Sequence, residues 1–95
     1  MRGGKLDLYE GEISMKIRIL GTGCPNCKKL YALTMQALAE LDIAADLQKV
    51  EDLKEIMSYK VLGTPGLVIN DNVKLYGKVP SLQEIKRLIQ EEQEN

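Results

Sequence analysis

The stretch Gly21–Leu30 (GTGCPNCKKL) constrains the fold most, because it takes the chain from a strand directly into a helix. Before it, Lys16–Leu20 (KIRIL) alternates polar and apolar residues and carries β-branched side chains, as strands do. Glycines at positions 21 and 23 indicate a turn. Pro25 suits the first helical position, where its missing N–H leaves no hydrogen bond unmade. Cys24 then falls at or beside the N-cap of this helix.

The remaining patterns predict three more strands and two more helices. Apolar residues recur at spacings of three and four as far as about Leu41, so the first helix has one apolar face. Further strands are expected at 44–50, 66–69 and 73–76, and further helices at 52–59 and from Ser81 onward. The order βαβαββα predicts an α/β fold in which helices flank a four-stranded mixed sheet.

Two of these helices carry finer expectations. In the helix over 52–59, we expect Leu53, Ile56 and Met57 to face the core. At the start of the last helix, Ser81 and Glu84 have the spacing of a capping box. The glutamate-rich end, residues 91–94, places negative charge where the helix dipole disfavours it, which predicts a frayed tail.

Length and charge exclude several classes of function. A chain of 95 residues with 44% hydrophobic composition accommodates one compact domain. The net charge is −1 and the basic residues are scattered, so we expect no nucleic-acid partner. Apolar runs are much shorter than the roughly 20 residues of a membrane span, so we expect no membrane partner either.

The first fourteen residues read as an extension that precedes the domain. They mix charged and single apolar residues and lack the apolar core of a secretory signal. We therefore assign residues 1–14 to a leader or an extension from an upstream start, and residues 15–95 to the domain. With no export signal, we expect a cytoplasmic location, and we expect a monomer.

Cys24 and Cys27 are the only cysteines, and in a reducing compartment such a pair is more often redox-active or metal-binding than a structural disulfide. A thiol at a helix N-terminus has a pKa below the free value of roughly 8.5. Cys27 lies one turn further along, within reach of a mixed disulfide at Cys24. The spacing thus predicts Cys24 as the nucleophile and Cys27 as the resolving thiol.

A metal site is the main alternative that the sequence leaves open. Two thiolates are half of a tetrahedral zinc site, and the chain has no third cysteine and no histidine. A two-coordinate soft-metal or metalloid carrier, or a four-thiolate site shared between two chains, stays open. The segment GTGCPNC also resembles the loop of heavy-metal-associated metallochaperone domains. A third possibility is a redox sensor without enzymatic activity.

A second motif favours the redox hypothesis. Val61–Gly66 (VLGTPG) leads into an apolar strand and resembles the cis-proline loop of the thioredoxin and glutaredoxin superfamily. The opening MKIRILGTGCPNC is similar to that of small archaeal and bacterial thioredoxin-like proteins, also called redox-active disulfide proteins. Metallochaperone domains end in a strand, whereas this chain ends in the helix that begins at Ser81.

The resemblance implies a thioredoxin fold and a thiol-disulfide oxidoreductase. Its catalytic residues would be Cys24 and Cys27, without a bound cofactor or metal. Residues expected to contact the substrate are Thr64, Pro65, Pro25 and Asn26, with Pro65 in the cis form and the Thr64 backbone offered as a strand edge. Partners would be proteins that contain disulfides, and an NADPH-dependent flavoprotein similar to thioredoxin reductase.

Two positions depart from the thioredoxin pattern. Thioredoxins carry Trp before the first cysteine, where this chain has Gly23. They also carry a buried aspartate in the preceding strand, which helps to deprotonate the resolving cysteine, and this strand has Arg18 instead. The motif therefore supplies no general base for Cys27.

Overall fold

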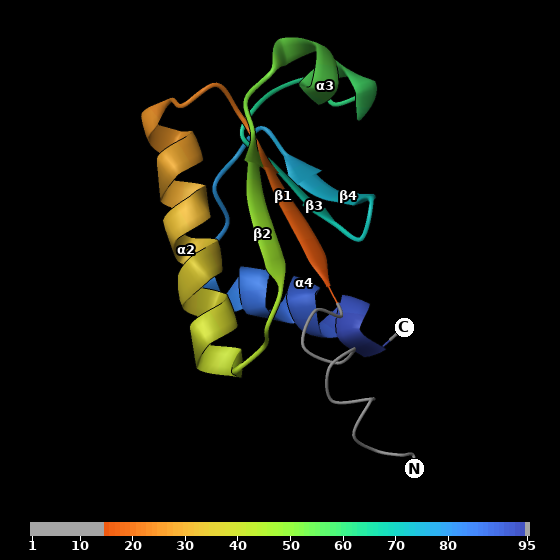
Figure 1. Ribbon diagram of the computed structural model, residues 1–95. Helices are drawn as coiled ribbons and strands as arrows, with labels where there is room; N and C mark the ends of the chain where they lie inside the picture. The colour runs from red at the N-terminus through yellow and green to blue at the C-terminus, as the bar shows by residue number, and fades with distance from the viewer. Residues whose placement is uncertain (1–14, 95) are drawn as a thin grey trace.

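The computed structural model describes residues 15–94, so the predicted extension over 1–14 lies outside the described residues. The elements are β1 (Lys16–Leu20), α2 (Pro25–Leu41), β2 (Asp46–Val50), α3 (Leu53–Ser58), β3 (Gly66–Ile69), β4 (Asn72–Tyr76) and α4 (Leu82–Glu94) (Figure 1). This order confirms the predicted βαβαββα arrangement. Among the helices that the structure describes, none has the length and apolar character to cross a membrane.

The four strands form one mixed sheet in the order β2-β1-β3-β4. β1 pairs in parallel with β2 and antiparallel with β3, and β3 pairs antiparallel with β4. In this register Leu20 lies beside both Val50 and Gly66. The residues that follow β1, those that follow β2 and those that precede β3 therefore meet at one end of the sheet.

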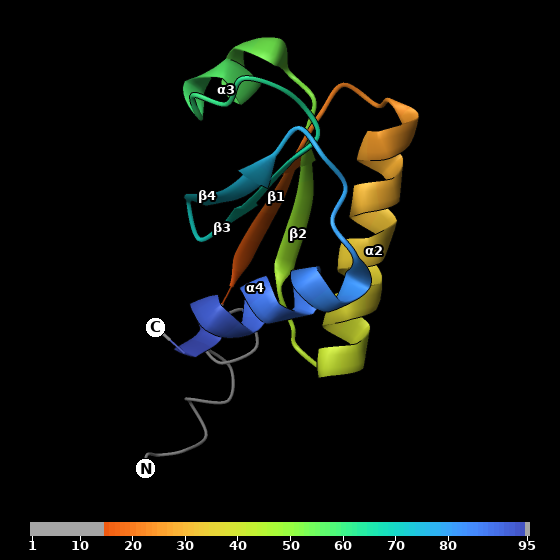
Figure 2. The same ribbon diagram turned by 180° about the vertical axis from the view of Figure 1, so that it is seen from behind.

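The helices cover both faces of the sheet. On one face, α2 and α4 pack over Ile17, Ile19, Leu67 and Ile69, which are all at most 2% exposed. Figure 2 shows α4 crossing below the strands beside α2, and the ion pair Lys86–Glu40 (2.8 Å) joins these helices. On the other face, Ile56 of α3 packs with Leu20, Val50 and Val68. Burial of each such aliphatic side chain contributes roughly 1.5–3 kcal/mol.

The prediction that Leu53, Ile56 and Met57 of α3 face the core is wrong for two of these three residues. Ile56 is buried at 3% exposure, but Leu53 and Met57 are 62% and 63% exposed. α3 has six residues, which is less than two turns, and Figure 1 shows it beyond the ends of the strands. There only Ile56 reaches the sheet.

The prediction for the start of α4 is confirmed, and the prediction for its end is wrong. At its start, Ser81 Oγ accepts a hydrogen bond from the Glu84 N–H at 3.2 Å, as the first half of the predicted capping box requires. At its end, the predicted frayed tail is wrong, because α4 continues to Glu94. Glu92 pairs with Lys74 of β4 at 2.6 Å and accepts a hydrogen bond from Asn72 at 3.0 Å, which offsets the unfavourable helix dipole.

The two clusters make a prediction about stability. Leu38→Ala should lower the free energy of unfolding by about 2–5 kcal/mol, because Leu38 is a buried residue of the larger cluster. Met57→Ala, at an exposed position, should change it by about 0.5 kcal/mol or less. Urea denaturation of the reduced proteins measures both. Equal losses in the two variants would contradict this assignment of core and surface.

Candidate active site

The turn between β1 and α2 places Cys24 at the N-cap of the helix. Gly23 has φ +93°, a left-handed conformation that glycine adopts without a steric penalty. Cys24 itself is extended (φ −69°, ψ 164°), and its Sγ accepts a hydrogen bond from the Cys27 N–H at 3.3 Å. Pro25 occupies the first helical position. A sulfur thus takes the place of the oxygen that usually caps a helix.

Cys27 is more deeply buried than Cys24: it is 5% exposed, while Cys24 is half-buried. Both are free thiols. The Cys27 sulfur packs directly against the backbone of Gly21: a Cβ added there would lie 2.2 Å from Sγ and 2.9 Å from the cysteine Cβ. Only glycine at position 21 leaves room for the buried thiol.

The two thiols have different acidities. Hydrogen bonds from the side chain and the backbone N–H of Cys27 hold the pKa of Cys24 below its ordinary value. Burial raises the pKa of Cys27, and its hydrogen bond to Cys24 raises it further. Cys24 is therefore the more acidic thiol of the pair, and Cys27 is the less acidic one.

The loop before β3 reaches the same end of the sheet. Because Leu20 pairs with Gly66, the residues next to them in the chain, Gly21 and Pro65, lie at the same end of the sheet. The Thr64–Pro65 peptide bond is cis, and Pro65 O accepts a hydrogen bond from the Gly77 N–H at 2.8 Å. Thr64 is exposed, whereas the Pro65 side chain is among the fully buried ones. Of the four expected substrate contacts, Pro25, Asn26 and Thr64 face solvent and Pro65 does not.

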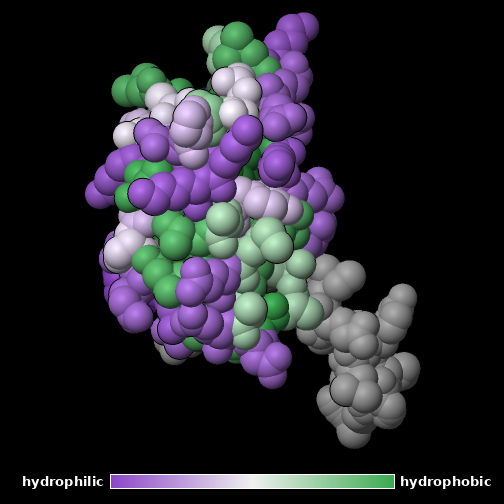
Figure 3. All heavy atoms as spheres, turned by 90° about the vertical axis from the view of Figure 1, so that its left-hand side faces the viewer, coloured by the Kyte–Doolittle hydropathy of each residue, from purple (hydrophilic) through white to green (hydrophobic). Residues whose placement is uncertain are grey.

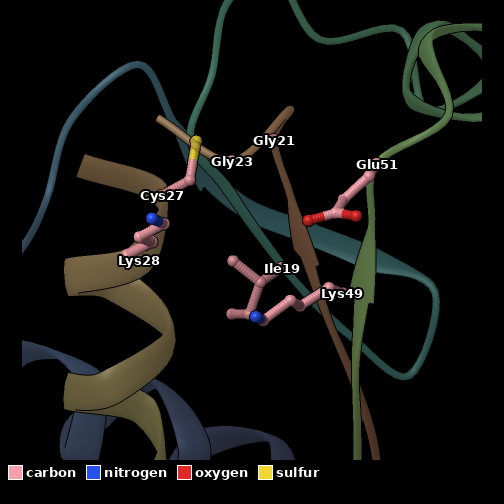
Figure 4. A pocket seen from close by; sticks show the side chains of 7 residues that line it. All are labelled: Ile19, Gly21, Gly23, Cys27, Lys28, Lys49 and Glu51. Carbon is pink, nitrogen blue, oxygen red and sulfur yellow. The ribbon is translucent and has the colours of Figure 1, made fainter. Parts of the chain in front are cut away.

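A small cavity of ≈ 30 Å³ lies beside the buried thiol. Cys27 and Lys28 approach it from α2, while Lys49 of β2 and Glu51 approach it from the other side (Figure 4). Ile19, Gly21 and Gly23 complete the lining. Sequence reasoning missed Glu51 and Lys49. The parallel register of β1 and β2, which places Val50 beside Leu20, would have pointed to both residues.

For a metal, the described part of the chain offers little besides the two thiols. Within residues 15–94, no group of three or more cysteine, aspartate or glutamate side chains converges as a metal site would require. A pair of thiols of unequal acidity at a helix N-terminus is instead suited to disulfide exchange. Fold and dithiol together define a thiol-disulfide oxidoreductase.

Comparison with known proteins agrees with this class. A sequence model of the thioredoxin domain matches residues 15–90. Thioredoxin from Methanocaldococcus jannaschii is 43% identical over 74 residues, which cover 78% of this chain and 85% of that protein. Thioredoxin from Methanothermobacter thermautotrophicus is 37% identical over 75 residues, covering 79% and 97%. The chain belongs to the thioredoxin family.

Solved structures support the fold. Oxidised thioredoxin from Plasmodium falciparum superposes with a TM-score of 0.57 at 13% identity, over 95% of this chain and 91% of that one. The germline-specific thioredoxin Deadhead from Drosophila melanogaster gives 0.60 at 13% identity, over 90% and 88%. Because the identity is so low, these matches support the thioredoxin fold and nothing further.

The contact between Gly21 and Cys27 predicts an unusual sensitivity to one added methyl group. Gly21→Ala should lower the free energy of unfolding by about 1–3 kcal/mol, because the new Cβ would overlap the buried sulfur. Gly63→Ala is the control, since the nearest atom to its new Cβ would be Gly77 Cα at 3.9 Å. Thermal and urea unfolding measure both. A Gly21 variant as stable as the control would contradict the close contact between Gly21 and the Cys27 sulfur.

The unequal acidities predict ordered alkylation. At about pH 7, iodoacetamide should modify Cys24 well before Cys27, because only the thiolate reacts. Cys27→Ala should raise the apparent pKa of Cys24, since it removes the side-chain hydrogen bond that favours the thiolate. Mass spectrometry of the peptides against pH gives both values. Equal alkylation rates for the two cysteines would be inconsistent with the assigned acidities.

Proposed function

We propose that this protein reduces disulfide bonds of other proteins, with Cys24 as the attacking thiolate and Cys27 as the resolving thiol. The observation that carries the proposal is the pair of unequal thiols at the start of α2. The Cys24 thiolate attacks one sulfur of the partner's disulfide, and the electron pair of the broken bond leaves on the other sulfur, which takes a proton. Cys27 then loses its proton and attacks Cys24. The second partner sulfur leaves, and the Cys24–Cys27 disulfide holds the oxidation.

Thr64 is the proposed main contact of the substrate backbone. It is exposed at the same end of the sheet as Gly21, and an extended segment could add to its backbone as a strand does to a sheet edge. Pro25 and Asn26, both exposed beside Cys24, would contact the residues around the partner's disulfide. Because Pro65 is fully buried, its proposed part is to support Thr64 from below.

Exposed apolar side chains near the site favour a protein partner. Leu53 and Met57 of α3 and Leu62 in the following loop are 62%, 63% and 90% exposed. In Figure 3, hydrophobic surface is visible at the α3 end of the molecule, and in Figure 1 the start of α2 lies at this same end. Exposed apolar groups that gather at one end of a small domain are typical of a protein-binding surface.

Each turnover leaves an oxidised protein, so a reductant is needed. By family resemblance, the proposed reductant is an NADPH-dependent flavoprotein of the thioredoxin reductase type, and the proposed location is the cytoplasm, where free thiols persist. The metal carrier and the redox sensor would use the same cysteines. Neither needs a buried resolving thiol beside a more acidic nucleophile, and the family match favours the oxidoreductase.

Single cysteine variants test the assignment of roles. Cys24→Ser should abolish reduction of insulin with dithiothreitol as reductant, because no thiolate remains to attack. Cys27→Ser should accumulate mixed disulfides with the substrate, which non-reducing gels and intact mass detect. Parent-level activity in both variants would sink the proposal.

A redox titration separates the oxidoreductase from the carrier. Metal-free protein equilibrated in thiol buffers should show one two-electron transition between about −180 and −300 mV. If no intramolecular disulfide forms in that range, the metal carrier becomes the better hypothesis. If the disulfide forms but insulin is not reduced, the redox sensor becomes the better hypothesis.

A further inference from the structure

The cavity beside Cys27 is lined by this buried thiol and by a carboxylate, that of Glu51. Its volume of ≈ 30 Å³ is enough for one or two water molecules. Glu51 is the residue directly after β2, and its Oε2 lies 3.9 Å from the point where a Cβ on Gly23 would sit. Figure 4 shows its carboxylate directed from the end of β2 across toward β1, with Cys27 on the far side of the cavity.

The resolving step requires a proton acceptor at this place. Burial favours the protonated form of Cys27, yet only its thiolate can attack the mixed disulfide. Cys24 cannot accept the proton at that stage, because its sulfur is bonded to the partner. Arg18, in the strand before the motif, is a cation and donates to Asp46 O at 2.9 Å. The proton must therefore leave by another route.

The charged groups that face the cavity leave one candidate. Lys28 of α2 and Lys49 of β2 carry ammonium groups, which only donate. Lys49 Nζ lies 4.8 Å from the centre of the Tyr31 ring, a cation–π contact with α2. Among the residues that the structure describes, Glu51 is the only carboxylate in the lining.

We propose that Glu51 accepts the proton of Cys27, through water in this cavity, during the resolving step. The inference rests on the proposed function. The S–H bond of Cys27 breaks, its proton passes through water to the Glu51 carboxylate, and the thiolate attacks Cys24 Sγ. The Cys24–partner bond breaks as the Cys24–Cys27 bond forms. The departing thiolate then takes up a proton from solvent, and Glu51 releases its own.

Stopped-flow reaction with an aromatic disulfide, 5,5′-dithiobis(2-nitrobenzoate), separates the two steps. Attack by Cys24 releases the first coloured thiolate in a phase that depends on reagent concentration. Attack by Cys27 releases the second in a phase that does not. At about pH 7, Glu51→Gln should slow the second phase by roughly tenfold or more and leave the first within about twofold. The gap should close toward about pH 9, where hydroxide replaces the carboxylate.

Asp52→Asn is the matched control. It removes the same charge at the next residue, whose side chain is not part of the cavity lining. It should leave both phases within about twofold of the parent. The inference is overturned if Glu51→Gln matches this control, or if it slows the second phase equally at every pH, as a merely structural role would. A parent protein without any second phase would instead overturn the proposed function itself.

Discussion

The hydrogen bond from the Cys27 N–H to Cys24 Sγ ties the chemistry of this protein to its fold. It satisfies one of the backbone donors that every helix leaves free at its start, and it also stabilises negative charge on the Cys24 sulfur. The same turn of helix carries the second thiol inward, against the backbone of Gly21. One local arrangement thus caps α2, acidifies Cys24 and buries Cys27. The rest of the structure holds this arrangement at the end of the sheet.

The central strand β1 provides that support. Its parallel pairing with β2 and antiparallel pairing with β3 bring three separate segments to one edge. The first carries the dithiol, the second carries Glu51, and the third carries Thr64 and Pro65. The larger core lies between the sheet and α2 with α4, so it fixes α2 along its length and not only at the reactive end. In α2, most of the buried side chains serve this packing, and the two sulfurs at its start are the ones to which we assign the reaction.

Much of this could be predicted from the sequence, because the local patterns and the tertiary structure agree. The alternation in 16–20, the glycines before Cys24 and the proline after it all specify a strand that turns into a helix, and the structure has that junction. The wrong expectations concern positions where a distant contact decides. Leu53 and Met57 have helical spacing toward the core, but α3 lies beyond the strands. The end of α4 is ordered by Lys74, eighteen residues before Glu92 in a different element.

The position of Glu51 at the cavity could not be predicted from the sequence, for the same reason. A carboxylate near a helix start suggests only a favourable contact with the helix dipole, and its place beside the cavity follows from the strand register. The position where thioredoxins carry a buried aspartate is occupied by Arg18, which pairs with Asp46 at 3.3 Å and stabilises the β1–β2 edge. A carboxylate at that position would lie near the Asp46 carboxylate, and like charges at close range disfavour each other. The strand interior is therefore used for an ion pair. Within residues 15–94, the carboxylate that lines the cavity beside Cys27 comes instead from the residue directly after β2.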